Sequence, residues 1–537
     1  MESNLKSLEF DKDSREHLLA GVTILTNAVK VTLGPRGNNV VIEQRGGPPL
    51  VTKDGVTVAR SINLRDKFAN LGAQIVKEAA SRACDVAGDG TTTATVLTHA
   101  IFSEGQRLIS AGFSSLDMRK GIEDSVNLVI SELCTMSRSV TGPEEIESVG
   151  TISANGEKEI GELIVKAMGL VGNSGIITVE EAKGFSTSLH VTDGAELDRG
   201  YISPYFVTDQ DKMVCELKDP LVLVTNKKIS SIREVVPLLE KVLGAGKSLL
   251  IIADDVDGEA LQGLVMNKAK GIINVCVIRA PEFGESRVPA LEDVSTLLGC
   301  ELFIGTDVDL MKTGLDALGR CDKAQIYRSK TVLVQPAGNR EKVEERVAAL
   351  KEQLRNPTLD EHTISVLTRR ISRLAGSVAV IRVGGSTELE VRERKDRVDD
   401  ALHATRAAVE GGILPGGGVS LVQASKSLRA LERKGNESYK AGVGIVRKAC
   451  SAPLKQILEN AGIPSERIID RVTKQTGGFG YDVAKLEWCN MYDRGIIDPT
   501  NVVISSLEHS TSAGLLLLSV GASIVDDTQT NNGELNG

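Results

Sequence analysis

The stretch DVAGDGTTTATVL, residues 85–97, places one acid, Asp89, between two glycines and follows it with three threonines. Threonine caps helices well, so Thr91 is expected to begin a helix at the end of this turn. Such an N-terminus offers unpaired N–H groups and hydroxyls to an anion, and glycine lets the backbone approach it closely. A phosphate fits there, but Asp89 would repel it unless a divalent cation lay between them. The stretch therefore predicts Asp89 as a Mg²⁺ ligand in a site for a metal-bound nucleotide.

Three further segments combine glycine with threonine, serine or a charged residue. They are TLGPRGNN (32–39), TKDGVTVA (52–59), which supplies Asp54, and LPGGGVSLVQA (414–424). No Walker A motif is present, and no GxGxxG follows a strand. Each segment alone is more often a simple turn, and a helix–loop–helix with a capping threonine explains residues 85–97 equally well. Together the four segments favour a nucleotide site.

The spacing of apolar residues predicts the elements in the first part of the chain. Helical spacing dominates residues 12–138, interrupted by a hairpin-like piece at 39–55. Between residues 220 and 305, apolar runs alternate with amphipathic segments, which is typical of a parallel sheet with crossover helices. The runs are LVLV (221–224), SLLIIA (248–253), INVCVI (273–278) and ELFI (301–304). We expect this region to form a separate α/β domain.

Helical spacing returns in the second half. Residues 343–354 and 364–374 predict an antiparallel helical hairpin, broken at Asn356-Pro357. A further helix with one apolar face at 398–409 is expected to stop at Gly411-Gly412. The last ten residues, TQTNNGELNG, predict disorder.

Composition limits the class of protein. The 537 residues exceed one typical domain, and the formal charge of −9 argues against binding to a nucleic-acid backbone. Eight cysteines contain no CxxC pair, so neither a metal framework nor a disulfide framework is indicated. The N-terminus lacks the apolar core of a signal peptide, and no run of 18 apolar residues occurs. These features predict a cytoplasmic protein without a membrane partner.

Long segments of the chain, in order from about Asp11 to Asp526, resemble a group I chaperonin subunit, the bacterial and organellar ATP-driven folding ring. The matching segments are VTLGPRGNNVV, VTKDGVTVAR, AGDGTTTATVL, LDRGYISPYF, KKISSIRE, LLIIADDVDGEAL, DDALHATRAAVEGGILPGGGV and MYDRGIIDPTNV. The resemblance implies a multidomain fold with a mostly α-helical equatorial ATPase domain, a small α/β intermediate hinge domain and an α/β apical domain with a parallel sheet core. The implied boundaries are 1–135 and 411–537 for the equatorial, 136–192 and 378–410 for the intermediate, and 193–377 for the apical domain.

The resemblance also implies roles for individual residues. Asp400 would position the attacking water with Asp54 as its helper, and Asp89 would hold Mg²⁺. ATP and K⁺ would be bound by Thr32, Leu33, Gly34, Pro35, Lys53, Asp89, Gly90, Thr91, Thr92, Thr93, Gly417, Asp482, Val483 and Asp498. Within this set Lys53, Thr32 and Thr92 match the monovalent-cation neighbourhood, and Gly417 and Asp498 match the adenosine end. Without the resemblance, Asp400 would be read as a charge on the solvated face of a helix.

A second implied surface binds clients. DRGYISPYF gathers aromatic residues in a chain in which aromatics make up 3%. Such a cluster is usually buried, but the resemblance places it in an exposed apical groove that takes unfolded or partly folded proteins, and also the mobile loop of a possible co-chaperonin lid. The groove residues would be Tyr201, Tyr205, Phe206, Val236, Leu239, Leu261, Val265 and Met266. Hinge motion near Gly194 and Gly376 would bury this surface after ATP binding.

Some positions depart from the family pattern. Asp482 replaces the usual asparagine near the adenine, Ser377 replaces a second glycine at the hinge, and the tail lacks Gly-Gly-Met repeats. The resemblance implies a homo-oligomeric ring, sevenfold, but leaves open whether one ring or two assemble. A ring that binds partners without hydrolysing ATP is the main alternative. A small-molecule kinase is a third possibility, although no second substrate pocket is recognisable.

Overall fold

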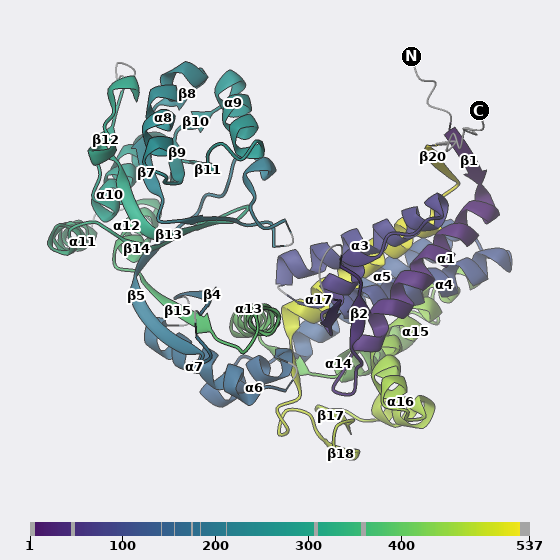
Figure 1. The fold of residues 1–537 in the computed structure, drawn as a ribbon. Coiled ribbons are helices and arrows are strands. Elements are labelled where there is room, and N and C mark those ends of the chain that lie inside the picture. The colour runs from purple at the N-terminus through teal and green to yellow at the C-terminus, as the bar shows by residue number, and fades with distance from the viewer. Residues whose placement is uncertain are drawn as a thin grey trace, which may run out of the picture. The chain divides into compact units, whose positions relative to one another are not determined.

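The structure, a computed structural model, describes residues 6–44, 49–87, 89–140, 142–154, 156–172, 175–182, 184–210, 212–305, 310–355 and 361–526. The chain divides into two compact units (Figure 1). Residues Met1–Lys166 and Ser386–Gly537 form the helical unit, and Ala167–Gly385 form the sheet unit. The predicted tail and the Asn356-Pro357 break lie outside the described residues.

Long helices build the helical unit. They are α1 (Asp11–Val29), α3 (Lys67–Ala87), α4 (Thr91–Ser110), α5 (Ser115–Met136), α13 (Glu388–Gly411), α15 (Glu437–Asn460) and α17 (Thr500–Leu518). Shorter helices are η1 (Lys30–Thr32), α2 (Gly55–Ser61), α6 (Pro143–Ser153), α14 (Val419–Ala424), η7 (Ser425–Ala430) and α16 (Ser465–Lys474), while α7 (Lys158–Val171) runs across the division into the sheet unit. Apolar side chains from both chain ends share one core, because α17 packs on α3 and α4 (Figure 1).

The crossing of α5 and α15 shows how tightly the two chain ends interlock. A Cβ on Gly121 would lie 2.2 Å from the Tyr439 carbonyl oxygen, and one on Gly442 would lie 2.3 Å from the Met118 carbonyl oxygen. Only glycine permits this backbone approach. The spacing of apolar residues predicted the separate helices, but not that these distant segments fold together.

Short strand pairs complete the helical unit. Antiparallel pairs are β1 (Lys6–Phe10) with β20 (Ala522–Asp526), β2 (Val40–Ile42) with β3 (Leu50–Thr52), β16 (Ile413–Pro415) with β19 (Ile497–Pro499), and β17 (Phe479–Asp482) with β18 (Glu487–Asn490). The β2–β3 pair confirms the predicted hairpin. The β1–β20 pair joins the beginning and end of the described chain (Figure 1).

The sheet unit contains a ten-stranded mixed sheet with the order β11-β9-β7-β13-β14-β5-β15-β4, with β12 beside β7 and β6 beside β13. The strands are β4 (Ile176–Glu181), β5 (Ser188–Leu197), β6 (Cys215–Lys218), β7 (Leu221–Thr225), β9 (Leu249–Ala253), β11 (Val275–Arg279), β12 (Leu302–Phe303), β13 (Gly319–Ile326), β14 (Thr331–Pro336) and β15 (Ser377–Val383). A small parallel pair adds β8 (Lys228–Ile229) and β10 (Asp255–Val256). The four predicted apolar runs are β7, β9, β11 and β12, and their pairing is parallel as predicted.

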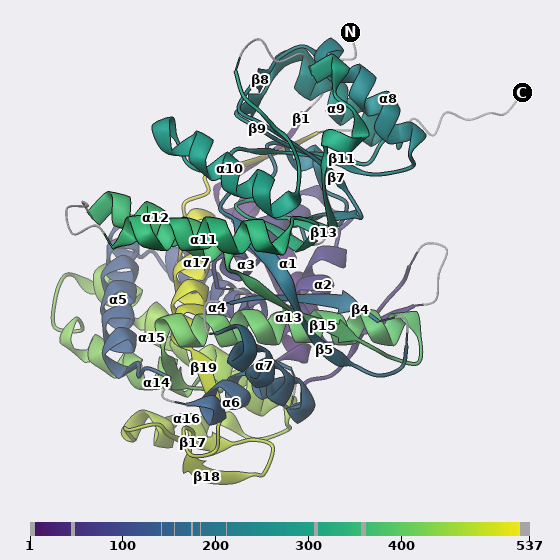
Figure 2. The same cartoon turned by 90° about the vertical axis from the view of Figure 1, so that its left-hand side faces the viewer.

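Helices accompany this sheet. They are η2 (Pro204–Phe206), η3 (Ile232–Glu234), α8 (Val236–Gly244), α9 (Gly258–Ala269), η4 (Gly284–Ser286), α10 (Arg287–Leu298), η5 (Leu310–Lys312), η6 (Leu315–Ala317), α11 (Arg340–Leu354) and α12 (Glu361–Leu374). The pair α11 and α12 is the predicted helical hairpin (Figure 2). Within the described residues, no helix combines the length and apolar character needed to cross a membrane.

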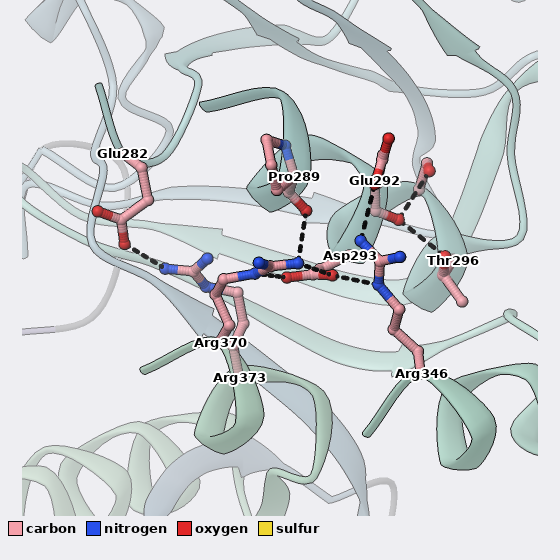
Figure 3. Close-up of polar contacts among 9 residues, drawn as sticks. Glu282, Pro289, Glu292, Asp293, Thr296, Arg346, Arg370 and Arg373 are labelled. Carbon is pink, nitrogen blue, oxygen red and sulfur yellow. Dashed lines mark hydrogen bonds and ion pairs between the residues drawn. The ribbon is translucent and has the colours of Figure 1, made fainter. Parts of the chain in front are cut away.

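A buried charge cluster attaches α11 and α12 to α10 (Figure 3). Asp293 of α10 is 0% exposed. Its carboxylate accepts hydrogen bonds from Arg370 Nε at 2.5 Å and Nη2 at 2.9 Å, and from Arg346 Nε at 2.8 Å. Arg346 also donates to Glu292 at 2.8 Å. The attachment of α11 and α12 to α10 thus depends on one carboxylate that is shielded from water.

Strand β5 changes partner within its length. Residues Ser188–Asp193 pair with β15, whereas Gly194–Leu197 pair with β14. A Cβ on Gly194 would lie 2.2 Å from Val378 Cγ2, so the close packing at this junction requires glycine. Ser377 begins β15 and pairs with Asp193. The predicted hinge at Gly194 therefore coincides with the exchange of strand partners.

Candidate functional site

The N-terminus of α4 forms the centre of the candidate site. Gly90 precedes the helix with φ 96°, in the left-handed region that glycine adopts without strain. The first helical hydrogen bond runs from Ala94 N–H to the Gly90 carbonyl at 2.8 Å. N–H groups of a first turn have no partner within their own helix, and α4 is 20 residues long. This helix end is therefore suited to an anion.

Asp89 lies directly before this turn. Its Oδ1 accepts a hydrogen bond from Gly90 N–H at 2.5 Å. Burial raises the pKa of Asp89, and the charge of Asp54 adds to the effect, although the bond from Gly90 opposes it. An ionised carboxylate in this position is costly unless a cation compensates it.

Asp54 is held beside α4 by its own helix. It caps α2, where its two oxygens accept from Val56 N–H at 2.9 Å and Thr57 N–H at 2.8 Å. The next residue, Gly55, is packed so closely that a Cβ there would lie 2.1 Å from Thr92 Oγ1. The ends of α2 and α4 therefore meet, and Asp54 is fixed near the anion-binding turn.

Asp400 reaches the same place from α13. Burial raises its pKa well above the usual range for aspartate, and the next largest contributions are the charges of Asp54 and Asp89. Helix α13 is fixed by an ion pair of Arg397 with Glu157, and by Arg394 Nη2 donating to Glu159 at 2.9 Å. The structure thus brings Asp400, the proposed catalytic residue, near Asp89, the predicted Mg²⁺ ligand.

A fourth carboxylate, Asp498, comes from β19. Burial and then the charge of Asp89 raise its pKa to about 6, while Gly417 N–H donates to it and opposes the shift. Gly417 has φ 65° and is followed by Gly418 at φ 76°, which directly precedes α14. The predicted glycine triplet is therefore a left-handed turn that lies against this acid.

The loop after α1 forms another part of the site. Asn460, at the end of α15, donates through Nδ2 to the carbonyls of Lys30 at 2.8 Å and Leu33 at 2.9 Å. Gly34 packs against Ile457 of the same helix. Asn460 was missed at the sequence level because a lone asparagine near a helix end carries no distinctive pattern.

Together these elements bring four carboxyl groups near one another. Asp89 interacts electrostatically with Asp54, Asp400 and Asp498, and three of the four carboxyl groups have raised pKa values. In the described residues, no three His, Cys, Asp or Glu side chains are arranged as a complete metal site. Mg²⁺ is commonly held by one or two carboxylates together with substrate phosphates, so the residues fit Mg²⁺ bound with a nucleotide.

Other predicted site residues are placed less directly. Asp482 Oδ1 accepts from the N–H groups of Ala484 at 2.9 Å and Lys485 at 3.1 Å, which gives it a local role in the β17–β18 turn. Val483 is buried in the cluster beside α14. Lys53 precedes Asp54 and Pro35 is exposed, but no contact in the described part of the chain places either against the carboxylates.

A second residue beside the site, after Asn460, was also not predicted. Cys84, in the last turn of α3, interacts with Asp400, Asp89, Asp54 and the side chain of Thr91. Burial, followed by the charges of Asp400 and Asp89, raises the pKa of its thiol to about 12. The sequence signal, a cysteine five residues before Asp89 on a helix, was present but resembles an ordinary packed cysteine.

The predicted client-binding residues separate into two groups. Tyr205 and Met266 are 75% and 57% exposed, whereas Phe206 is fully buried in the core of the sheet unit. Tyr201 and Leu239 are also buried in that core, and Val236, Leu261 and Val265 are partly buried. The prediction that Phe206, Tyr201 and Leu239 are exposed is wrong for this structure. In the short helix η2, Tyr205 points outward while Phe206 packs inward.

The chain thus combines a helical unit that carries an acidic helix-end site with an α/β unit built on a mixed sheet. The model of the TCP-1/cpn60 chaperonin family matches residues 25–528, and the chain belongs to this family. The multidomain fold class predicted from the sequence is confirmed.

Two solved structures are similar to the chain. Both are of the chaperonin gp146 from the bacteriophage EL 2 (Pseudomonas aeruginosa), in the presence of ATP-BeFx. Crystal form II matches with a TM-score of 0.66 and 24% identity over 96% of this chain and 99% of that chain. Crystal form I matches with a TM-score of 0.61 and 23% identity over the same shares. At sequence identities of 24% and 23%, the structural similarity shows that the fold is shared.

Proposed function

We propose that the chain is a Mg-ATP-hydrolysing chaperonin subunit of the group I type. The observation that carries this proposal is the convergence of Asp54, Asp89 and Asp400 beside the open N-terminus of α4. A ring that only binds partners would have little use for Asp400 next to Asp89. In the bound state Mg²⁺ would supply charge neutralisation for the phosphates.

Each part of the site then has a task. The first turn of α4, with Thr91, Thr92 and Thr93, would hold the phosphate oxygens, and Asp89 would hold the metal. Asp400 orients the attacking water and accepts its proton, a task to which a carboxylate of raised pKa is suited. Asp54, fixed by its capping bonds, supports Asp400 through its charge.

The remaining site residues hold the rest of the ligand. Lys53, Thr32 and Thr92 would form the neighbourhood of a monovalent cation such as K⁺. The adenosine end is held by Gly417 and Asp498, with Asp482 and Val483 nearby. The three-domain division predicted from the sequence, a cytoplasmic location and a co-chaperonin lid belong to the same proposal.

Magnesium dependence tests the ATPase. Purified protein is expected to release phosphate from ATP with Mg²⁺, and at least tenfold more slowly after chelation by EDTA, because the carboxylates repel a metal-free nucleotide. Malachite-green detection measures the release, and re-addition of Mg²⁺ is the control for irreversible damage. Equal rates with and without the metal, or no hydrolysis at all, would contradict the proposal, and the latter would favour a ring that only binds.

Ring assembly is supported by two exposed ribbons of the helical unit. In β1–β20 the cross-strand partners Leu8 and Ile524 are both exposed, and in β2–β3 the partners Val41 and Val51 are both exposed. Two-stranded ribbons are marginally stable alone, and their free edges and apolar pairs favour pairing with another chain. Different patches on one subunit generate a closed ring by heterologous contacts. The proposed ring is sevenfold, which negative-stain electron microscopy checks.

The exposed residues of the sheet unit are proposed to capture clients. Tyr205 and Met266 offer apolar area to any unfolded chain, and methionine adapts its shape to different partners. This surface requires no particular client sequence. It is therefore suited to non-native proteins in general.

Tyr205→Glu is expected to weaken capture of a denatured client at least fivefold without changing ATP hydrolysis, because a charge replaces exposed apolar area. Suppression of aggregation of unfolded rhodanese measures capture. Phe185→Glu is the matched control, since Phe185 is 79% exposed in the same unit and lies outside the proposed surface. Unchanged capture by Tyr205→Glu, or an equal loss in both variants, would count against this surface.

A further inference from the structure

The last two turns of α15 lie against two separate segments of the candidate site. A Cβ on Gly418, in the glycine turn before α14, would lie 2.7 Å from the backbone nitrogen of Leu454. A Cβ on Gly34 would lie 3.0 Å from Cγ2 of Ile457, three residues further along the helix. Residues three apart lie on the same face of an α-helix. One face of α15 therefore supports both the glycine turn and the loop of residues 30–34 that follows α1.

Loop 30–34 also lies close to the first turn of α4. A Cβ on Gly55 would lie 2.1 Å from Thr92 Oγ1 and 3.5 Å from Val29 Cγ1, so the end of α1 is near that first turn. Thr32 Oγ1 donates to the Val29 carbonyl at 2.9 Å, and η1 contacts α4. On the other side, Leu33 packs on the apolar cluster that contains the first residue of α14. The loop therefore lies between the anion-binding turn of α4 and the glycine turn.

The side chain of Asn460 attaches this loop to α15. Its Nδ2 donates to the carbonyl oxygen of Lys30 at 2.8 Å and to that of Leu33 at 2.9 Å, so both amide hydrogens are used. Its Oδ1 accepts from Gln456 Nε2 at 2.8 Å, which fixes the orientation of the amide. Gln456 is itself only 9% exposed. Asn460 thus holds two backbone carbonyls, one on either side of Thr32.

We propose that Asn460 is a positioning residue that sets the affinity of the site for a nucleotide, because it holds loop 30–34 between the two turns. This inference rests on the proposed function. Without the two hydrogen bonds the loop backbone gains freedom, and a nucleotide has to order it again on binding, which weakens affinity. Asn460 acts through the loop and not on the reacting atoms. Turnover of the saturated enzyme therefore changes little when Asn460 is replaced.

Two variants of full-length protein test this role. Asn460→Asp keeps the shape of the side chain but directs a carboxylate at two carbonyl oxygens, so the Kd of Mg-AMP-PNP should rise at least tenfold. Hydrolysis at saturating Mg-ATP should stay within threefold. Gln456→Glu removes the donor that orients the Asn460 amide and should raise the Kd by about threefold. Isothermal titration calorimetry measures the Kd and the number of binding sites per chain.

Hydrogen exchange of the nucleotide-free protein gives a readout that does not depend on activity. The amides of Leu33 and Asn38 donate to the carbonyls of Lys30 at 3.2 Å and Val31 at 2.7 Å. In Asn460→Asp, peptides covering residues 30–38 should exchange at least fivefold faster, because the loop is no longer held to α15.

Glu459→Gln is the matched control for Asn460→Asp. It changes the adjacent residue, whose side chain is 46% exposed and pairs with Lys455 at 3.8 Å. Neither the Kd nor the exchange should change in this variant.

An unchanged Kd in Asn460→Asp would overturn the proposal, as would an equal rise in Glu459→Gln. Fewer binding sites at an unchanged Kd would also overturn it, because the side chain would then only support folding. If Asn460→Asp does not fold, an unchanged Kd in Gln456→Glu has the same consequence. Binding of Mg-AMP-PNP to the unsubstituted protein is measured first. Failure there contradicts the proposed function itself, whereas failure only in the variants contradicts the role of Asn460.

Discussion

Replacing Asp400 by asparagine is expected to lower ATP hydrolysis at least a hundredfold while nucleotide binding is retained. Asparagine keeps the shape of the side chain but cannot accept a proton from water, and general-base catalysis typically contributes two to four orders of magnitude. Binding should be unchanged or slightly tighter, because one of several mutually repelling carboxylates is removed. Single-turnover phosphate release measures hydrolysis. Fluorescence of Trp488, the one tryptophan of the chain, measures binding, since it packs against the apolar cluster that contains Val483 and Met491.

Asp399→Asn is the matched control for Asp400→Asn. It removes the same charge one residue away on α13, and its carboxylate contributes less to the pKa of Asp400 than Asp54 and Asp89 do. We expect less than a threefold change in turnover. Near-normal hydrolysis by Asp400→Asn would remove this residue from the chemistry, and equal losses in both variants would indicate a general electrostatic effect of the helix.

Asp293→Ala should have the largest effect on stability. It leaves the guanidinium groups of Arg370 and Arg346 without the buried carboxylate that accepts three of their hydrogen bonds. Removing one partner from a buried ion pair typically costs about 3–5 kcal/mol, because the remaining charge is desolvated and uncompensated. Since α11 and α12 are attached through this acid, their amides should lose protection first (Figure 3). Hydrogen exchange followed by mass spectrometry measures this local stability.

Glu292→Ala provides the comparison for Asp293→Ala. Glu292 also pairs with Arg346, at 2.8 Å, but its side chain is 46% exposed. Partly exposed pairs contribute about 0–1 kcal/mol, so exchange in α11 and α12 should change little. If both variants lost protection equally, burial of Asp293 would not be the cause. If neither did, the packing of apolar side chains alone would hold these helices.

Local patterns predicted most of the individual elements. The apolar runs became parallel strands because strands buried on both faces need continuous apolar sequence. Helix α4 begins at Thr91 as predicted, although its N-cap is Gly90 and no threonine side chain caps it, and the C-cap of α13 is Gly412, where glycine adopts a positive φ without strain. Such signals depend on neighbours in the sequence, so they are visible without a structure.

Long-range arrangements could not be predicted in this way. The close approach of Gly121 to Gly442 depends on two segments more than three hundred residues apart, and nothing local distinguishes these glycines from others. The inward position of Phe206 depends on the sheet against which η2 packs. The electrostatic coupling of Asp498 to Asp89 likewise depends on tertiary packing. The family resemblance supplied the idea that these acids act together, which residue spacing did not.

The helical unit is built from two segments that are far apart in the sequence, and the sheet unit lies between them in the chain. Because β1 pairs with β20, the outer ends of these two segments lie side by side. Lys6 lies opposite Asp526 in the same antiparallel ribbon, and their side chains form an ion pair. A short linker between these two positions would give a circular permutant in which residues 386–526 continue directly into 6–166. In such a molecule the helical unit would be one uninterrupted segment, with new termini placed in a surface loop of the sheet unit.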